Sequence, residues 1–177
     1  FLQKNNIVFF SLLTLKFPMS KKLDLKKSLK AFIRYLRNLK QDISYLYVYE
    51  YSNIIHIHLL VNIDFKGNFY HLKLKWSSII GESQDYLHYI EVDNANQNVS
   101  YSRLIAYLSK TIFETATLNK INMFLRHSNQ PLLKYTFSGD NKIKNFLINF
   151  REEKKIVETL FLNKNIQLNL SLSSIYH

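Results

Sequence analysis

The chain has 177 residues, and its 47% apolar and 15% aromatic content is typical of one compact domain or two small ones. Three glycines and two prolines are too few for a glycine-rich phosphate loop, and the lack of cysteine excludes disulfides, iron–sulfur clusters and thiolate zinc sites. The net charge of +11 favours a polyanionic partner such as nucleic acid, although a lysine- and asparagine-rich composition is also what an AT-rich gene produces.

The longest apolar stretch, residues 7–15, is interrupted by Ser11 and Thr14. It is shorter than the roughly 20 residues that a membrane-spanning helix needs. We therefore expect a soluble protein with no membrane partner. The composition favours an AT-rich bacterial or organellar genome, so we expect the protein in a cytoplasm or in an organelle. The sequence does not determine the oligomeric state.

The first elements are a strand and an amphipathic helix. Residues 7–17 are rich in β-branched and aromatic side chains up to Pro18, which predicts a strand. Residues 20–40 carry apolar side chains at helical spacing. A basic stripe follows a neighbouring face of this helix and consists of Lys22, Lys26, Lys30 and Arg34. A solvated face explains the stripe more readily than DNA contact does.

The next segment predicts a hairpin, a helix and a strand. Residues 44–51 and 54–63 are two strand-like runs separated by a short break, as in a tight hairpin. Residues 68–80 have helical spacing and stop at Gly81, and residues 86–92 predict a further strand. Their order favours helices packed on an antiparallel sheet, an α+β fold.

The remaining sequence is less regular. It predicts a polar loop over 93–100, helices over 101–117 and 142–155, and a late strand over 166–172. We expect a main domain over 1–129 and a C-terminal appendage over 130–177 that packs on the same domain.

Two histidines mark the second strand of the predicted hairpin. His56 and His58 are two residues apart, so they project from the same side of the strand, opposite an apolar row that includes Ile57. They can share one metal ion, or they can be structural histidines. A divalent ion typically needs a further hard ligand, and a carboxylate is the usual one.

Glu50 is the candidate for that ligand. A hairpin loop of three residues places Glu50 directly across from His56 on the same face, whereas a two-residue loop turns its carboxylate into the apolar row. The second arrangement costs several kcal/mol for an unpaired buried charge, so we expect the three-residue loop. That register sends four tyrosines to the core side, namely Tyr45, Tyr47, Tyr49 and Tyr51.

Tyr107 begins a Tyr-Leu-Ser-Lys motif that ends at Lys110. Counted at about 100° per residue, it falls outside the apolar stripe that runs through Leu108, on a face that it shares with Arg103 and Lys110. Its hydroxyl could be presented to an anion beside two cations. A surface tyrosine with basic neighbours is the simpler alternative.

Together these motifs resemble a known family. The His56-Ile57-His58 strand, followed by Trp76 and then by Tyr107 and Lys110 in one helix, looks like the HUH endonuclease superfamily, specifically the single-tyrosine rolling-circle replication initiators (Rep proteins) of plasmids. Residues 12–17 are similar to the first, weaker motif of that family. The resemblance covers roughly residues 7–113 and implies a five-stranded antiparallel sheet flanked by helices, an HUH or RRM-like fold.

The resemblance also implies an activity. It is site-specific nicking and joining of single-stranded DNA at a replication origin, dependent on Mn²⁺ or Mg²⁺. Tyr107 matches the nucleophile, Lys110 the motif lysine, and His56 and His58 the metal ligands, with Glu50 matched by approximate position only. We place Arg103 at the DNA. A single-tyrosine HUH transposase and a non-catalytic nucleic-acid-binding module are the alternatives.

Overall fold

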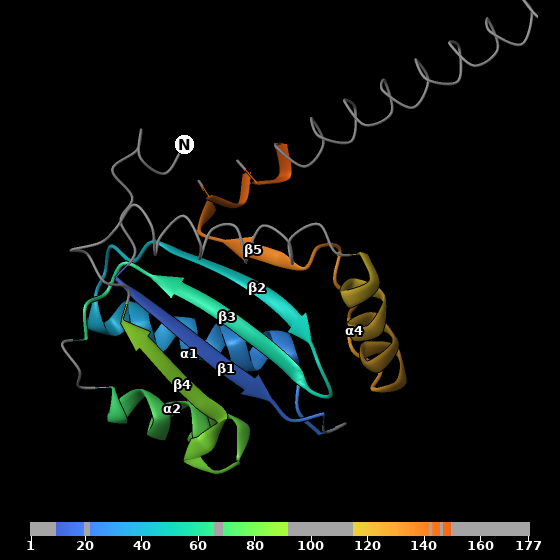
Figure 1. Ribbon diagram of the computed structural model, residues 1–177, viewed down its shortest axis with the longest axis horizontal. Coiled ribbons are helices and arrows are strands. Elements are labelled where there is room, and N and C mark those ends of the chain that lie inside the picture. Colours follow the sequence, from blue (N-terminus) through green and yellow to red (C-terminus); the bar gives the residue numbers. More distant parts are fainter. Residues whose placement is uncertain are drawn as a thin grey trace, which may run out of the picture. The chain divides into compact units, whose positions relative to one another are not determined.

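The computed structural model describes residues 10–19, 22–65, 69–91, 115–141, 143–145 and 147–149 (Figure 1). The chain divides into two compact units, residues 1–140 and 141–177. The described residues of the second unit are helical and fall in or next to the range where we predict a helix, 142–155. No helix in the described ranges is long and apolar enough to cross a membrane.

The first unit is built on a five-stranded antiparallel sheet with the strand order β4-β1-β3-β2-β5. The strands are β1 (Ser11–Phe17), β2 (Tyr45–Tyr51), β3 (Ile55–Val61), β4 (Leu87–Glu91) and β5 (Phe137–Gly139). Their pairing and the flanking helices confirm the predicted α+β class.

Three described helices accompany the sheet: α1 (Leu25–Leu39), α2 (Tyr70–Ile80) and α4 (Thr115–His127), with a 3₁₀ turn η2 (Gln84–Tyr86) before β4. In Figure 1, α1 lies behind the sheet and α4 lies beside the hairpin end of β2 and β3. The order β1-α1-β2-β3-α2-β4, with β1 and β3 in the centre, is the split βαβ arrangement.

The main core lies between one face of the sheet and helices α1 and α2. Alternate residues of β1 and β3 point into it, because strand side chains alternate between faces. Trp76 of α2 is fully buried there and meets Phe32 of α1 edge-to-face, with ring centroids 5.4 Å apart. The predicted tyrosines of β2 face the same core: Tyr45 and Tyr49 are buried, while Tyr47 and Tyr51 are partly buried against it.

The opposite side of the sheet, which we call the second face, has an apolar end and a polar end. Its apolar end is buried and consists of Leu12, Leu46, Val48, Leu60 and Phe137. Its polar end carries side chains from four strands, namely Thr14 and Lys16 (β1), Glu50 (β2), His56 and His58 (β3), and His88 (β4). The candidate site is this polar end.

The helix boundaries differ from the predicted ones. Helix α1 begins at Leu25 and not at Ser20, because Asp24 is its N-cap and accepts a hydrogen bond from the Lys27 amide at 2.9 Å. Helix α2 begins at Tyr70 and ends as predicted at Gly81, which adopts a left-handed conformation with φ 69°.

Helix α4 and strand β5 are absent from the predicted elements. The predicted helix end at Thr117 is wrong, since α4 runs on to His127 and buries Thr117, Ile121 and Leu125. These three residues follow each other at four-residue spacing, a signal that the sequence does contain. The strand β5 has three residues, too few to show a pattern, and it extends the first compact unit to Asp140, past the expected boundary at residue 129.

Candidate functional site

Strand β3 presents two histidines on the second face. Ile55, Ile57 and Leu59 are fully buried on the core side, so the alternating His56 and His58 face away from the core, as predicted. Their rings are nearly parallel, with an interplanar angle of 13° and centroids 6.4 Å apart. The apolar row therefore fixes the side from which both imidazoles project.

Glu50 reaches these histidines from β2. The hairpin loop has three residues, 52–54, and Glu50 pairs with His56 across the ladder, which confirms the predicted register. Its Oε2 atom lies 2.7 Å from Nε2 of the diagonal neighbour, His58. The His58 side chain is 11% exposed and that of Glu50 is 32% exposed, so this contact is partly shielded from solvent.

Two hydroxyl groups lie within hydrogen-bond distance of the Nδ1 atoms of His58 and His56. Thr14 Oγ1 lies 3.1 Å from Nδ1 of His58, and Ser52 Oγ lies 3.2 Å from Nδ1 of His56. Because the Glu50 carboxylate only accepts hydrogen bonds, Nε2 of His58 carries the proton of that contact. Nδ1 of His58 bonds the Thr14 hydroxyl, which can either donate or accept. Sequence reasoning missed both hydroxyls. The Thr14 contact depends on the pairing of β1 with β3, which a local pattern does not reveal.

His56 lies in a partly buried, cationic environment. Burial and the neighbouring His58 lower the pKa of His56 below 6.5, against the opposing effect of Glu50. Lys16 and His88 lower this pKa further. The net downward shift of the pKa favours neutral His56, which is the form of an imidazole that binds metal.

The residues fit a divalent cation by their chemistry. Two imidazoles and one carboxylate on one face of a hairpin form a donor set that suits Mn²⁺, and the harder Mg²⁺ favours the carboxylate oxygens. In the ranges that the structure describes, no three His, Asp or Glu side chains already converge on one point. The proton that His58 shares with Glu50 must leave Nε2 before that nitrogen can ligate. Thus His56, His58 and Glu50 would hold an ion after local rearrangement.

The predicted nucleophile and its basic neighbours lie outside the described residues. Tyr107, Lys110 and Arg103 all fall in the range 92–114. They remain predictions from the sequence.

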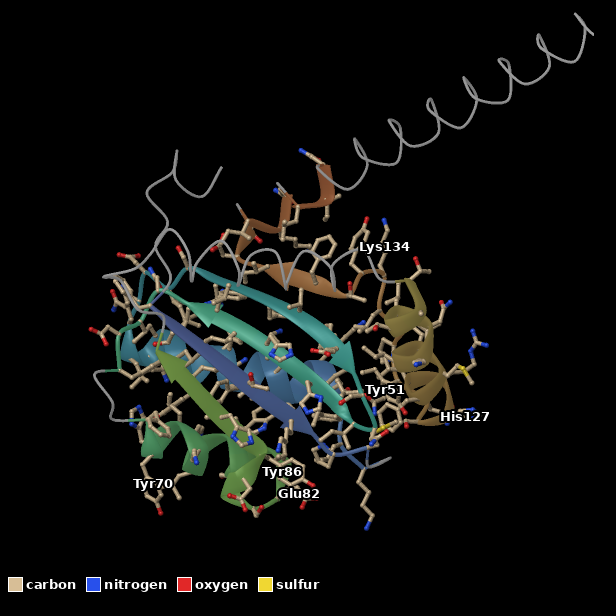
Figure 2. The ribbon with its side chains drawn as sticks, in the orientation of Figure 1. Tyr51, Tyr70, Glu82, Tyr86, His127 and Lys134 are labelled. Atoms are coloured by element: carbon tan, nitrogen blue, oxygen red, sulfur yellow. The ribbon has the colours of Figure 1, made fainter. Side chains whose placement is uncertain are left out.

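Two tyrosines of β2, Tyr45 and Tyr49, are poor nucleophiles. Burial raises the pKa of Tyr45, and it raises the pKa of the fully buried Tyr49 far more. A phenolate is therefore disfavoured at both positions. Tyr51 packs under the Lys120 ammonium, 5.8 Å from its ring centroid, and Tyr70 lies on α2, away from the polar end (Figure 2).

Two other features singled out in the sequence have structural roles. The indole of Trp76 donates a hydrogen bond to the Lys16 carbonyl at 3.0 Å, which links the core to β1. Lys26, Lys30 and Arg34 of the basic stripe lie on α1, whereas Lys22 precedes it. Lys26 donates to the Leu132 carbonyl at 2.9 Å. All four stripe residues are exposed.

Comparison of the chain with protein-family models, curated proteins and solved structures found no match.

Proposed function

We propose that this chain is a metal-dependent enzyme that nicks and rejoins single-stranded DNA, of the type that initiates rolling-circle replication of a plasmid. The observation that carries the proposal is the cluster of Glu50, His56 and His58 on the face opposite the core, with Glu50 across from His56 and 2.7 Å from His58. An apolar core does not need these groups there, whereas a cation site does. The resemblance of Tyr107 and Lys110 to the family motif supplies the reaction type.

In the proposed reaction, the Tyr107 oxygen attacks the scissile phosphorus and loses its proton to solvent. The bond from phosphorus to the 3′ oxygen breaks, and that oxygen takes up a proton from solvent, which leaves a free 3′-hydroxyl and a 5′-phosphotyrosyl link. Attack by a 3′-hydroxyl reverses the step and joins DNA. Lys110, three residues after Tyr107 in the sequence, steadies the phosphate. A divalent ion, when bound, offsets negative charge on the phosphate oxygens.

A non-catalytic binding module is less well supported. Such a module typically stacks bases on aromatic side chains of its sheet. Here the β2 tyrosines face the core, and Phe137 on the second face is buried. The polar end of that face carries donor and cationic side chains instead. A transposase of the same class shares the chemistry and differs only in its DNA substrate.

The test is the formation of a covalent adduct. The full chain is incubated with Mn²⁺ and a pool of random-sequence single-stranded oligonucleotides that carry a fluorophore at the 3′ end. Cleavage leaves the downstream fragment on the tyrosine, so the protein band becomes fluorescent and stays so in denaturing gels.

The adduct should disappear with EDTA, in Tyr107→Phe and in His58→Ala. It should persist in Tyr70→Phe, the matched control on the exposed surface of α2. No adduct from the wild-type chain, or an undiminished adduct in His58→Ala, would reject the proposal.

A further inference from the structure

Side chains of opposite charge lie on the two sides of His56 at the polar end of the second face. Lys16 and Glu50 both pair with His56, from β1 on one side and from β2 on the other. The central imidazole is thus flanked by a carboxylate toward β2 and by an ammonium toward β1. Directly opposite residues on neighbouring strands have Cβ atoms about 5 Å apart, so all three groups act on one small region.

The backbone of Lys16 is held in place, and no ion pair among the described residues includes its ammonium group. Its carbonyl accepts the hydrogen bond of the buried Trp76 indole at 3.0 Å, which fixes the backbone at this point. Asp24–Lys27 and Glu50–His58 are ion pairs within the described ranges, and neither includes Lys16. A lysine beside metal-ligating groups repels a cation, so its presence is best explained by an anion that binds there together with the ion.

The two sides of the second face also differ in exposure. Toward β2 and β5 the surface is closed, since Val48 is 0% and Phe137 is 3% exposed. Toward β4, His88 is exposed, and it pairs with Thr14 on the strand that carries Lys16. A chain-like ligand that follows the open side of this face therefore meets the accessible polar side chains of β1 and β4, among the described residues.

We propose that single-stranded DNA crosses the second face over β1 and β4, with the Lys16 ammonium on a backbone phosphate beside the metal-ligating residues and His88 next to the following phosphate. This inference rests on the proposed function and extends it. It assigns Lys16 as a substrate-contacting residue and β4, not β5, as the side on which the DNA lies.

The test is the salt dependence of DNA binding without cleavage. Tyr107→Phe protein in EDTA is titrated against a 3′-fluorescein-labelled 20-nucleotide single strand, and fluorescence anisotropy gives the affinity at several salt concentrations. Each phosphate contact on single-stranded DNA contributes about 0.7 to the slope of log affinity against log salt. Adding Lys16→Met should weaken binding and reduce the slope by about 0.7.

Two further variants control this measurement. Lys16→Arg keeps the charge and should restore the slope. Lys134→Met removes an exposed charge just before β5, the edge strand opposite β4 (Figure 2). This variant should leave the slope unchanged.

An unchanged slope in Lys16→Met, an equal loss in Lys134→Met, or no binding by the parent protein would overturn the inference. Its failure is separable from that of the proposed function. A reduced slope without any Mn²⁺-dependent adduct in the wild-type chain keeps the DNA path and rejects the nuclease. An adduct together with an unchanged slope in Lys16→Met keeps the nuclease and rejects the DNA path.

Discussion

Thr14 and His58 lie on neighbouring strands, 44 residues apart in the chain, and the threonine hydroxyl is 3.1 Å from the imidazole Nδ1. A hydroxyl can donate to that nitrogen or accept from it. The pair therefore supports His58 with its proton on Nε2, as in the contact with Glu50, and equally with the proton on Nδ1, which frees Nε2 for a metal ion.

Thr14→Val should weaken Mn²⁺ binding, because the nearly isosteric side chain removes the partner of Nδ1. Loss of such an outer hydrogen bond typically costs about 10- to 100-fold in metal affinity. Isothermal titration calorimetry measures it. Thr14→Ser should retain most of the affinity, and Ser77→Ala, which removes a hydroxyl bonded to the Ser83 carbonyl, should not alter it. Equal Mn²⁺ affinity in Thr14→Val and wild type would contradict the role of Thr14.

The pKa of His56 should lie below 6.5 in the folded protein, as measured by NMR titration of the ring. Because the pKa of His56 is lower in the folded than in the unfolded state, its contribution to stability is fully present above the unfolded-state pKa. This contribution is lost as the pH falls through the folded-state pKa. Lys16→Met should raise the pKa of His56 and Glu50→Gln should lower it further, since their charges act in opposite directions. A midpoint above 6.5 in the wild type would contradict the environment described for His56.

Trp76→Ala should destabilise the fold strongly. The side chain is fully buried against Phe32 and donates a hydrogen bond to Lys16, so the loss should be about 3–5 kcal/mol in the free energy of unfolding. Urea denaturation gives the value. Tyr70→Ala, at a position 58% exposed, should change the free energy of unfolding by less than about 0.5 kcal/mol. Similar values for the two variants would show that Trp76 does not organise the core.

The basic stripe, with Lys26, Lys30 and Arg34 on α1 and Lys22 just before that helix, should contribute little to DNA affinity. Helix α1 packs on the core face of the sheet, opposite the polar end of the second face. Replacing Lys22, Lys26, Lys30 and Arg34 together by glutamine should therefore reduce the salt slope less than Lys16→Met alone. Fluorescence anisotropy with the same oligonucleotide decides this, and a larger loss from the four substitutions would place DNA on α1.

Tyr107→Phe should abolish both nicking and the covalent adduct while the fold and metal binding are retained, because only the attacking oxygen is removed. Tyr101→Phe should keep both activities, since a count of about 100° per residue along the sequence places Tyr101 on the predicted apolar stripe that runs through Leu108. Mass spectrometry of the digested adduct identifies the modified residue. A phosphotyrosyl link on any other tyrosine would refute the assignment of Tyr107.

The sequence by itself determined the hairpin and the faces of its side chains. Alternation along β3 separates Ile57 from His56 and His58, and the cost of burying a lone carboxylate selects the loop length that places Glu50 across from His56. Gly81 marked the end of α2 because a left-handed residue ends a helix at little cost when it is glycine. These features depend on residues close together in the chain.

Only the tertiary structure decided which side chains from distant segments join the site. Thr14, Lys16 and His88 reach the histidines because β1 lies between β3 and β4, and strand order and register across such long separations leave no local pattern. The contact of Glu50 with its diagonal neighbour His58 also depends on the twist of the two strands, which the sequence does not show. Strand β5 is three residues long and forms through its pairing with β2, since so short a segment has too little preference of its own to be a strand.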